Sequence, residues 1–150
     1  MIKRMSEVSN GIPCTTTTTA VVAALKEFGV KKISVATPYI DEVNDRLNKY
    51  FTKSGFEILK IKGLQIGEPI AICNQVPETV YRLAKEVDDP AAEGIFISCA
   101  DFRTGSVVES LEKDLKKPVI AAIQASFWHA LRLAKVGGPI EGFGRLLQML

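Results

Sequence analysis

Four short apolar runs alternate with helix-like segments along the chain, and this alternation constrains the fold more than any other feature. The runs lie near residues 33–37, 56–61, 94–99 and 118–122, and each contains isoleucine or valine. Short runs of this composition are typical of β-strands. Because a helical segment separates each run from the next, we expect right-handed β-α-β crossovers and a parallel sheet.

The helical segments show apolar spacing and end signals. We predict helices over residues 20–28, 41–54, 77–87, 106–115 and 124–135. One of the threonines 15–19 can serve as the N-cap of the first helix, and Gly29 can end it. Ser106 and Glu109 fit the capping-box pattern of the fourth helix. Residues 63–76 show no such signal, which predicts an irregular loop.

The predicted fold is a single α/β domain over residues 1–150, with helices on both faces of the sheet. A chain of 150 residues with 47% hydrophobic side chains can build one such core. The simplest arrangement of four strands is the flavodoxin-like order 2-1-3-4. In that order the first and third strands are neighbours whose connections leave toward opposite faces, and ligands bind in the crevice at their carboxyl ends. This order brings Tyr39 and Cys99 to one crevice.

Charge and hydropathy exclude several classes of partner. Nineteen basic and 17 acidic residues are interspersed and give a net charge of +2, which predicts no nucleic-acid partner and no anionic membrane surface. No apolar stretch approaches the roughly 18 residues of a membrane span. The first residues lack the apolar core of a signal peptide, so we expect a cytoplasmic protein with reduced thiols.

The three cysteines, Cys14, Cys73 and Cys99, lie far apart and form no C-x-x-C pair. The single histidine, His129, has no metal-ligand spacing with them, so no metal site is predicted. His129 lies off the apolar face of its helix and is expected to be exposed. Cys14 and Cys73 are interpreted as incidental.

Each candidate site residue has a structural alternative. Cys99 is either a small packing side chain or a reactive thiol, whose thiolate Arg103 and the next helix start would stabilise and Asp101 would oppose. Tyr39 is either a packing aromatic or a donor to a carboxylate or enolate oxygen. Threonines 15–19 are either a simple helix cap or, together with the helix amides, an anion site.

Four motifs occur in an order that resembles a known family. They are IPCTTTTTAVVAAL, T-P-Y-x-x-E-V-N (residues 37–44), S-C-A-D-F-R-T (residues 98–104) and KPVIAAIQASFWHALR. Together they resemble the maleate isomerase and arylmalonate decarboxylase branch of the aspartate/glutamate racemase superfamily. The likeness runs from about Gly11 to Leu147.

The resemblance implies an enzyme without metal or organic cofactor that binds a small carboxylate between two pseudo-symmetric halves. Each half can supply a cysteine, and Cys99 matches that of the second half. Tyr39 matches a contact to a substrate oxygen. Their neighbours are predicted to bind substrate: Thr37, Pro38, Ala100 and Asp101. Ala100 stands where the family commonly has threonine, which removes one possible hydroxyl contact. A substrate-binding asparagine often lies in the family's counterpart of residues 63–76, and the resemblance offers Glu68 or Asn74 for that position.

Maleate cis-trans isomerisation is the leading hypothesis from the resemblance. The alternatives are an arylmalonate decarboxylase-like or racemase-like enzyme, or a non-catalytic carboxylate-binding fragment. Only 14 residues precede Thr15, so the resemblance covers the second half of such enzymes. We therefore expect either a fragment or a shortened relative, with weak or absent isomerase activity of its own. Cys14 aligns with the approach to the first helix and does not replace the missing cysteine.

The last helix and the tail would help to join the two halves in the family. With no first half to cover their apolar side chains, we expect a homodimer through this surface. The residues concerned are Phe127, Trp128, Leu131, Phe143, Leu146, Leu147, Met149 and Leu150.

Overall fold

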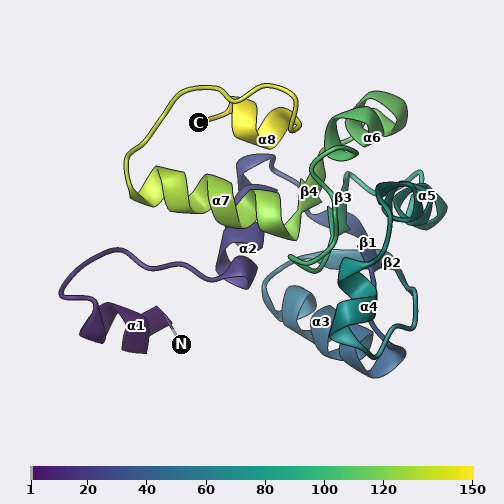
Figure 1. The fold of residues 1–150 in the computed structure, drawn as a ribbon, viewed down its shortest axis with the longest axis horizontal. Helices are drawn as coiled ribbons and strands as arrows, with labels where there is room; N and C mark the ends of the chain where they lie inside the picture. Colours follow the sequence, from purple (N-terminus) through teal and green to yellow (C-terminus); the bar gives the residue numbers. More distant parts are fainter. Residues whose placement is uncertain (1) are drawn as a thin grey trace.

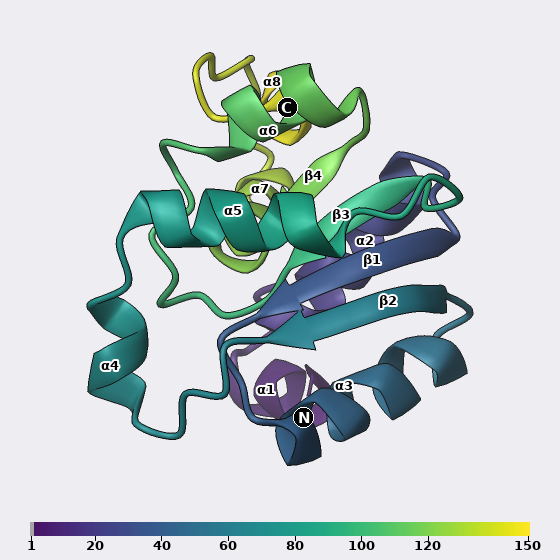
Figure 2. The same cartoon turned by 90° about the vertical axis from the view of Figure 1, so that its right-hand side faces the viewer.

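All strands of the sheet run parallel, in the order β2-β1-β3-β4 (Figure 2). The computed structural model describes residues 2–150. The strands are β1 (Lys32–Thr37), β2 (Glu57–Gly63), β3 (Gly94–Ile97) and β4 (Val119–Ala121). The predicted α/β class and strand order are confirmed. The third and fourth strands are shorter than predicted, and Cys99 lies two residues beyond the end of β3.

Helices cover both faces of the sheet, as predicted (Figures 1 and 2). Helices α2, α3 and α7 pack on one face, and α5 and α6 on the other. The helices are α1 (Ile2–Val8), α2 (Thr17–Glu27), α3 (Asp41–Lys53), α4 (Pro69–Cys73), α5 (Pro77–Val87), α6 (Val108–Leu115), α7 (Ala122–Leu133) and α8 (Arg145–Gln148).

The hydrophobic core has two layers, one on each face of the sheet, because successive side chains of a strand point to opposite faces. Ile33, Val35 and Phe96 pack with α2, α3 and α7. Ala36, Ile95 and Ile97 pack with α5 and α6. Full burial of a large apolar side chain contributes about 1.5–3 kcal/mol, so these two layers hold the helices to the sheet.

The start of α2 follows the sequence prediction. Thr16 is the N-cap, and its hydroxyl accepts a 3.3 Å hydrogen bond from the amide of Thr19. At the other end Gly29 adopts φ +66°, a conformation that glycine reaches without strain. These signals place α2 with its first turn beside the carboxyl edge of the sheet.

Two local predictions are wrong. Residues 63–76 include the short helix α4, which opens with Pro69. Ser106 and Glu109 do not form a capping box. Helix α6 begins at Val108 without a side-chain cap, and the carbonyl of Thr104 accepts the amides of Val107 and Val108 instead.

The tail is packed against its own chain to a larger extent than expected. Trp128, Leu146 and Leu147 are buried, because the loop after α7 returns α8 to the side of that helix. The prediction that these three side chains lack a partner is therefore wrong. Phe127, Phe143 and Met149 remain exposed.

Among the described residues, none of the helices has the length and apolar character needed to cross a membrane.

Candidate active site

A cleft of about 510 Å³ lies at the carboxyl edge of the sheet, where β1 and β3 end side by side. Its lining includes a group of polar side chains in which Cys99, Ser98 and Asp101 interact with Tyr39. The apolar part of the lining, here called the apolar wall, comes from α2, α3 and β3. Its residues include Val21, Val43, Leu47, Tyr50, Phe51 and Phe96. The structure therefore confirms that Tyr39 and Cys99 share one crevice.

Cys99 occupies a strained position in the loop after β3. Its φ is +83°, in the left-handed region that favours glycine, and the residue is only 9% exposed. On one side the amide of Ser98 donates a 2.8 Å hydrogen bond to the carbonyl of Ala36, and on the other Phe102 is buried in the core. Such strain persists only where the surroundings impose it, and it concentrates at functional sites.

A buried hydrogen-bond network fixes the turn that carries Tyr39. The Thr37 hydroxyl donates to the side-chain oxygen of Asn44 at 2.6 Å and accepts the amide of Tyr39 at 3.2 Å. The side-chain amide of Asn44 donates to the Tyr39 carbonyl at 3.4 Å. Gly63 completes this arrangement, because a Cβ there would lie 2.1 Å from that carbonyl oxygen.

The environment keeps Tyr39 protonated. Burial raises the pKa of its hydroxyl to about 12, and hydrogen bonding and charge interaction with Cys99 add to the rise. Ser98 lowers this pKa by hydrogen bonding, and the charge of Asp101 raises it. At neutral pH Tyr39 is therefore a neutral hydroxyl that can donate a hydrogen bond to an oxyanion.

The other predicted site residues divide into two groups. Ala100 and Asp101 line the cleft with Cys99. Thr37 and Pro38 are buried and do not line the cleft, and the Thr37 hydroxyl is engaged with Asn44. Neither Glu68 nor Asn74 is among the lining residues.

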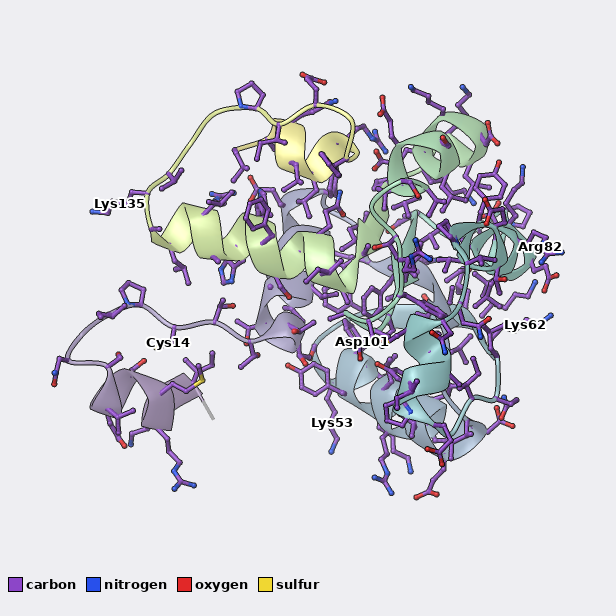
Figure 3. All side chains as sticks on the ribbon, viewed as in Figure 1. Cys14, Lys53, Lys62, Arg82, Asp101 and Lys135 are labelled. Carbon is purple, nitrogen blue, oxygen red and sulfur yellow. The ribbon has the colours of Figure 1, made fainter. Side chains whose placement is uncertain are left out.

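The remaining cysteines lie outside the cleft. Cys14 is in the segment between α1 and α2, well apart from Asp101 in the loop after β3 (Figure 3). Its thiol donates to the carbonyl of Ile12 at 3.3 Å. Cys73 is exposed at the end of α4. Within residues 2–150, Cys99 is the cysteine that the cleft contains.

The expectation of an exposed His129 is wrong. The ring is partly buried, and its Nδ1 lies 2.7 Å from the hydroxyl of Thr15. Burial lowers the pKa of His129, and the charge of Arg132 lowers it further. His129 does not line the cleft.

Sequence reasoning missed two contributors to the site, Asn44 and Arg46. Asn44 stands in the T-P-Y-x-x-E-V-N motif, but its role depends on the fold that brings it under Tyr39. Thr17 and Thr18, which belong to the threonine run considered above as a cap or an anion site, also line the cleft, from the first turn of α2. Arg46 lines it from α3 and is paired with Glu42 one turn earlier. In the described part of the chain, no group of three or more His, Cys, Asp or Glu side chains is arranged to hold a metal ion.

The comparisons with known proteins point to one family. The family model described as arylmalonate decarboxylase matches residues 1–147. An arylmalonate decarboxylase from Bordetella bronchiseptica is 33% identical over 141 residues, which cover 92% of this chain and 59% of the relative. A maleate isomerase from Alcaligenes faecalis is 23% identical over 91% of this chain and 54% of its own length.

A solved structure agrees with the sequence matches. A crystal structure of arylmalonate decarboxylase superposes with a TM-score of 0.89 at 33% identity, over 97% of this chain and 65% of that chain. The 150 residues thus span between half and two thirds of the length of these relatives.

Proposed function

The chain belongs to the arylmalonate decarboxylase family, and on this basis we propose that it supplies the reacting thiol of a cofactor-independent decarboxylase. The substrate class is a small malonate-type acid with an apolar substituent on its α-carbon. The observation that carries the proposal is the cleft itself, where Cys99 and Tyr39 interact and apolar residues line the same space.

The proposed reaction needs one proton donor at the α-carbon. The bond between the α-carbon and one carboxylate breaks, CO₂ leaves, and the bonding electron pair spreads into the remaining carboxylate as an enediolate. The thiol of Cys99 then donates its proton to the α-carbon. The resulting thiolate takes a proton from water, which restores the starting state.

The hydroxyls around Cys99 fit the charge that develops in this step. The enediolate carries more negative charge on its oxygens than the starting carboxylate, so donors placed there stabilise the transition state. Tyr39 remains protonated because its pKa is about 12. Ser98 lines the cleft, interacts with the Tyr39 hydroxyl and offers a second hydroxyl.

The apolar wall favours a substrate with an aryl or alkyl group. Leu47, Tyr50 and Phe96 can contact such a group, and aromatic side chains add favourable ring contacts. Maleate carries only two carboxylates on a double bond and would leave this wall unused. The higher identity to the decarboxylase, 33% against 23%, points the same way.

Maleate isomerisation is the second candidate, and one observation favours it. The Arg46 side chain lines the cleft and could attract a second carboxylate. In that reaction the Cys99 thiolate would add to the double bond, the resulting single bond would rotate, and elimination of the thiolate would give fumarate.

Proton NMR in D₂O separates the two candidates. The purified protein is incubated with α-methyl-α-phenylmalonate or with maleate, and heat-denatured protein is the control. We expect 2-phenylpropionate with deuterium on its α-carbon, above the rate of the control, and no fumarate. Fumarate without phenylpropionate would replace the proposal by the second candidate, and neither product would contradict both.

A further inference from the structure

The lining of the cleft includes two charged side chains, Arg46 and Asp101. Arg46 comes from α3, on the same face of that helix as Val43 and Tyr50 of the cleft lining. Asp101 belongs to the loop that carries Cys99. Among the described residues that line the cleft, the positive charge therefore comes from Arg46 alone.

Arg46 lies at the rim of the cleft and is only loosely held there. Its side chain is 73% exposed and forms an ion pair with Glu42, one turn earlier on α3, whose side chain is 68% exposed. An ion pair between two exposed side chains is weak, because water solvates both partners. The guanidinium can therefore exchange Glu42 for a carboxylate that enters the cleft, to which it can donate a pair of parallel hydrogen bonds.

We propose that Arg46 makes the cleft selective for substrates with two carboxylates over products with one. This role rests on the proposed function, in which a malonate-type diacid loses one carboxylate and leaves as a monoacid. At neutral pH the diacid carries one negative charge more than the monoacid. Because Tyr39 and Ser98 are proposed to hold one carboxylate, Arg46 acts on the charge that only the diacid has.

The exposed position of Arg46 determines which step of the reaction it affects. A charge at the rim of a site mainly changes how fast an oppositely charged ligand associates, and how strongly salt weakens the binding. A tight, dry contact with the carboxylate that leaves would instead stabilise the starting diacid and slow the loss of CO₂. Arg46 is therefore a specificity-determining residue that acts on binding, and it neither donates the proton nor holds the enediolate.

The ion pair between Arg46 and Glu42 provides two variants with opposite expected effects. Arg46→Gln removes the positive charge from the lining, so the diacid should bind more weakly. Glu42→Gln removes the carboxylate that competes for the guanidinium, so the diacid should bind more tightly. A purely structural role of the pair would not produce opposite changes, because both variants break the same contact.

Binding is measured without turnover, by NMR titration of ¹⁵N-labelled protein in the Cys99→Ala background, which is expected to leave the diacid intact. The ligands are α-methyl-α-phenylmalonate and 2-phenylpropionate, which differ by one carboxylate. We expect the diacid to bind more tightly than the monoacid. Its Kd should rise about five-fold with Arg46→Gln and fall about two-fold with Glu42→Gln, while that of the monoacid changes by less than about two-fold. In about 0.5 M NaCl the effect of Arg46→Gln on the diacid should shrink.

Arg82→Gln is the matched control, because Arg82 lies on α5, which packs on the other face of the sheet, and its loss should change neither Kd. An unchanged Kd of the diacid with Arg46→Gln, an equal weakening of both ligands, or an equal effect of Arg82→Gln would overturn the proposal. A diacid that binds no more tightly than the monoacid before either substitution would also overturn it.

The assay of product formation tests the proposed function separately. Binding of the diacid that depends on Arg46, without any formation of 2-phenylpropionate by the wild type, would support selection for diacids and contradict the decarboxylation. Formation of 2-phenylpropionate together with an unchanged Kd for Arg46→Gln would do the reverse.

Discussion

The Thr37 hydroxyl donates a 2.6 Å hydrogen bond to the side-chain oxygen of Asn44, and Asn44 in turn donates to the carbonyl of Tyr39. Both Thr37 and Asn44 are buried. The turn that carries Tyr39 to the cleft is therefore held from beneath by side chains that do not line the cleft.

Replacement of Asn44 tests this network. Asn44→Ala leaves the Thr37 hydroxyl without its acceptor, so we expect the free energy of unfolding in urea to fall by about 1–3 kcal/mol. Asn48→Ala, on the exposed side of the same helix, should change it by less than about 0.5 kcal/mol. Equal losses in the two variants would contradict a role for the network.

A substitution at Gly63, the last residue of β2, also tests the turn that carries Tyr39. A Cβ at this position would lie 2.1 Å from the Tyr39 carbonyl oxygen and 2.6 Å from the Asn44 side-chain nitrogen, so the turn must shift. We expect Gly63→Ala to lower the melting temperature and the turnover of any substrate. Gly67→Ala, whose Cβ would meet no atom within 4 Å, is the matched control and should change neither.

The raised pKa of Tyr39 predicts how the free energy of unfolding depends on pH in alkaline solution. Its pKa is about 12 in the folded state and 10.0 in the reference state, so the folded state holds its proton more tightly. This contribution to stability is fully present below pH 10 and is lost as the pH rises toward 12. The unfolding free energy of the wild type should therefore fall more steeply over this window than that of Tyr39→Phe. Parallel curves would argue against a raised pKa.

The same variant separates stability from activity. Tyr39→Phe keeps the ring and removes the donor, so at neutral pH we expect turnover to fall roughly 100- to 1000-fold, the usual effect of a lost oxyanion donor. An active Tyr39→Phe variant would exclude the hydroxyl as a catalytic donor. Tyr50→Phe removes a hydroxyl from the apolar wall of the same cleft and should retain most of the turnover.

The backbone at Cys99 predicts that two variants without the thiol differ in stability but not in activity. Cys99→Gly and Cys99→Ala both remove the thiol, but glycine alone adopts φ +83° without strain. We therefore expect Cys99→Gly to be more stable than Cys99→Ala by about 1 kcal/mol in chemical denaturation, while both are inactive. An alanine variant as stable as the glycine variant would show that this strain is absent.

The sequence predicted the strand order, the two-faced packing and the meeting of Tyr39 with Cys99, because apolar periodicity and chain connectivity determine these features. It did not reveal α4, since five residues are too few to show helical periodicity. The predicted capping box at Ser106 is absent, because the carbonyl of Thr104 accepts the amides at the start of α6 instead.

Long-range contacts were beyond sequence reasoning. The contact of His129 with Thr15 joins residues 114 positions apart, and the sequence gives no sign of it. The only available signal was that His129 lies off the apolar face of its helix, which suggested an exposed side chain. The role of Asn44 likewise depends on the position of the Tyr39 carbonyl. The positive φ of Cys99 has no sequence signal, because cysteine is not a residue that favours this conformation.

The central claim is that the thiol of Cys99 delivers the proton to the α-carbon. The most direct measurement is the rate of 2-phenylpropionate formation from α-methyl-α-phenylmalonate by wild type, Cys99→Ala and Cys73→Ala at equal concentration. We predict that the enzymatic rate of Cys99→Ala is at least about 100-fold lower than that of the wild type, which is the lower end of the effect of losing a general acid. The rate of Cys73→Ala should equal that of the wild type. A Cys99→Ala variant that forms product at the wild-type rate would contradict the account.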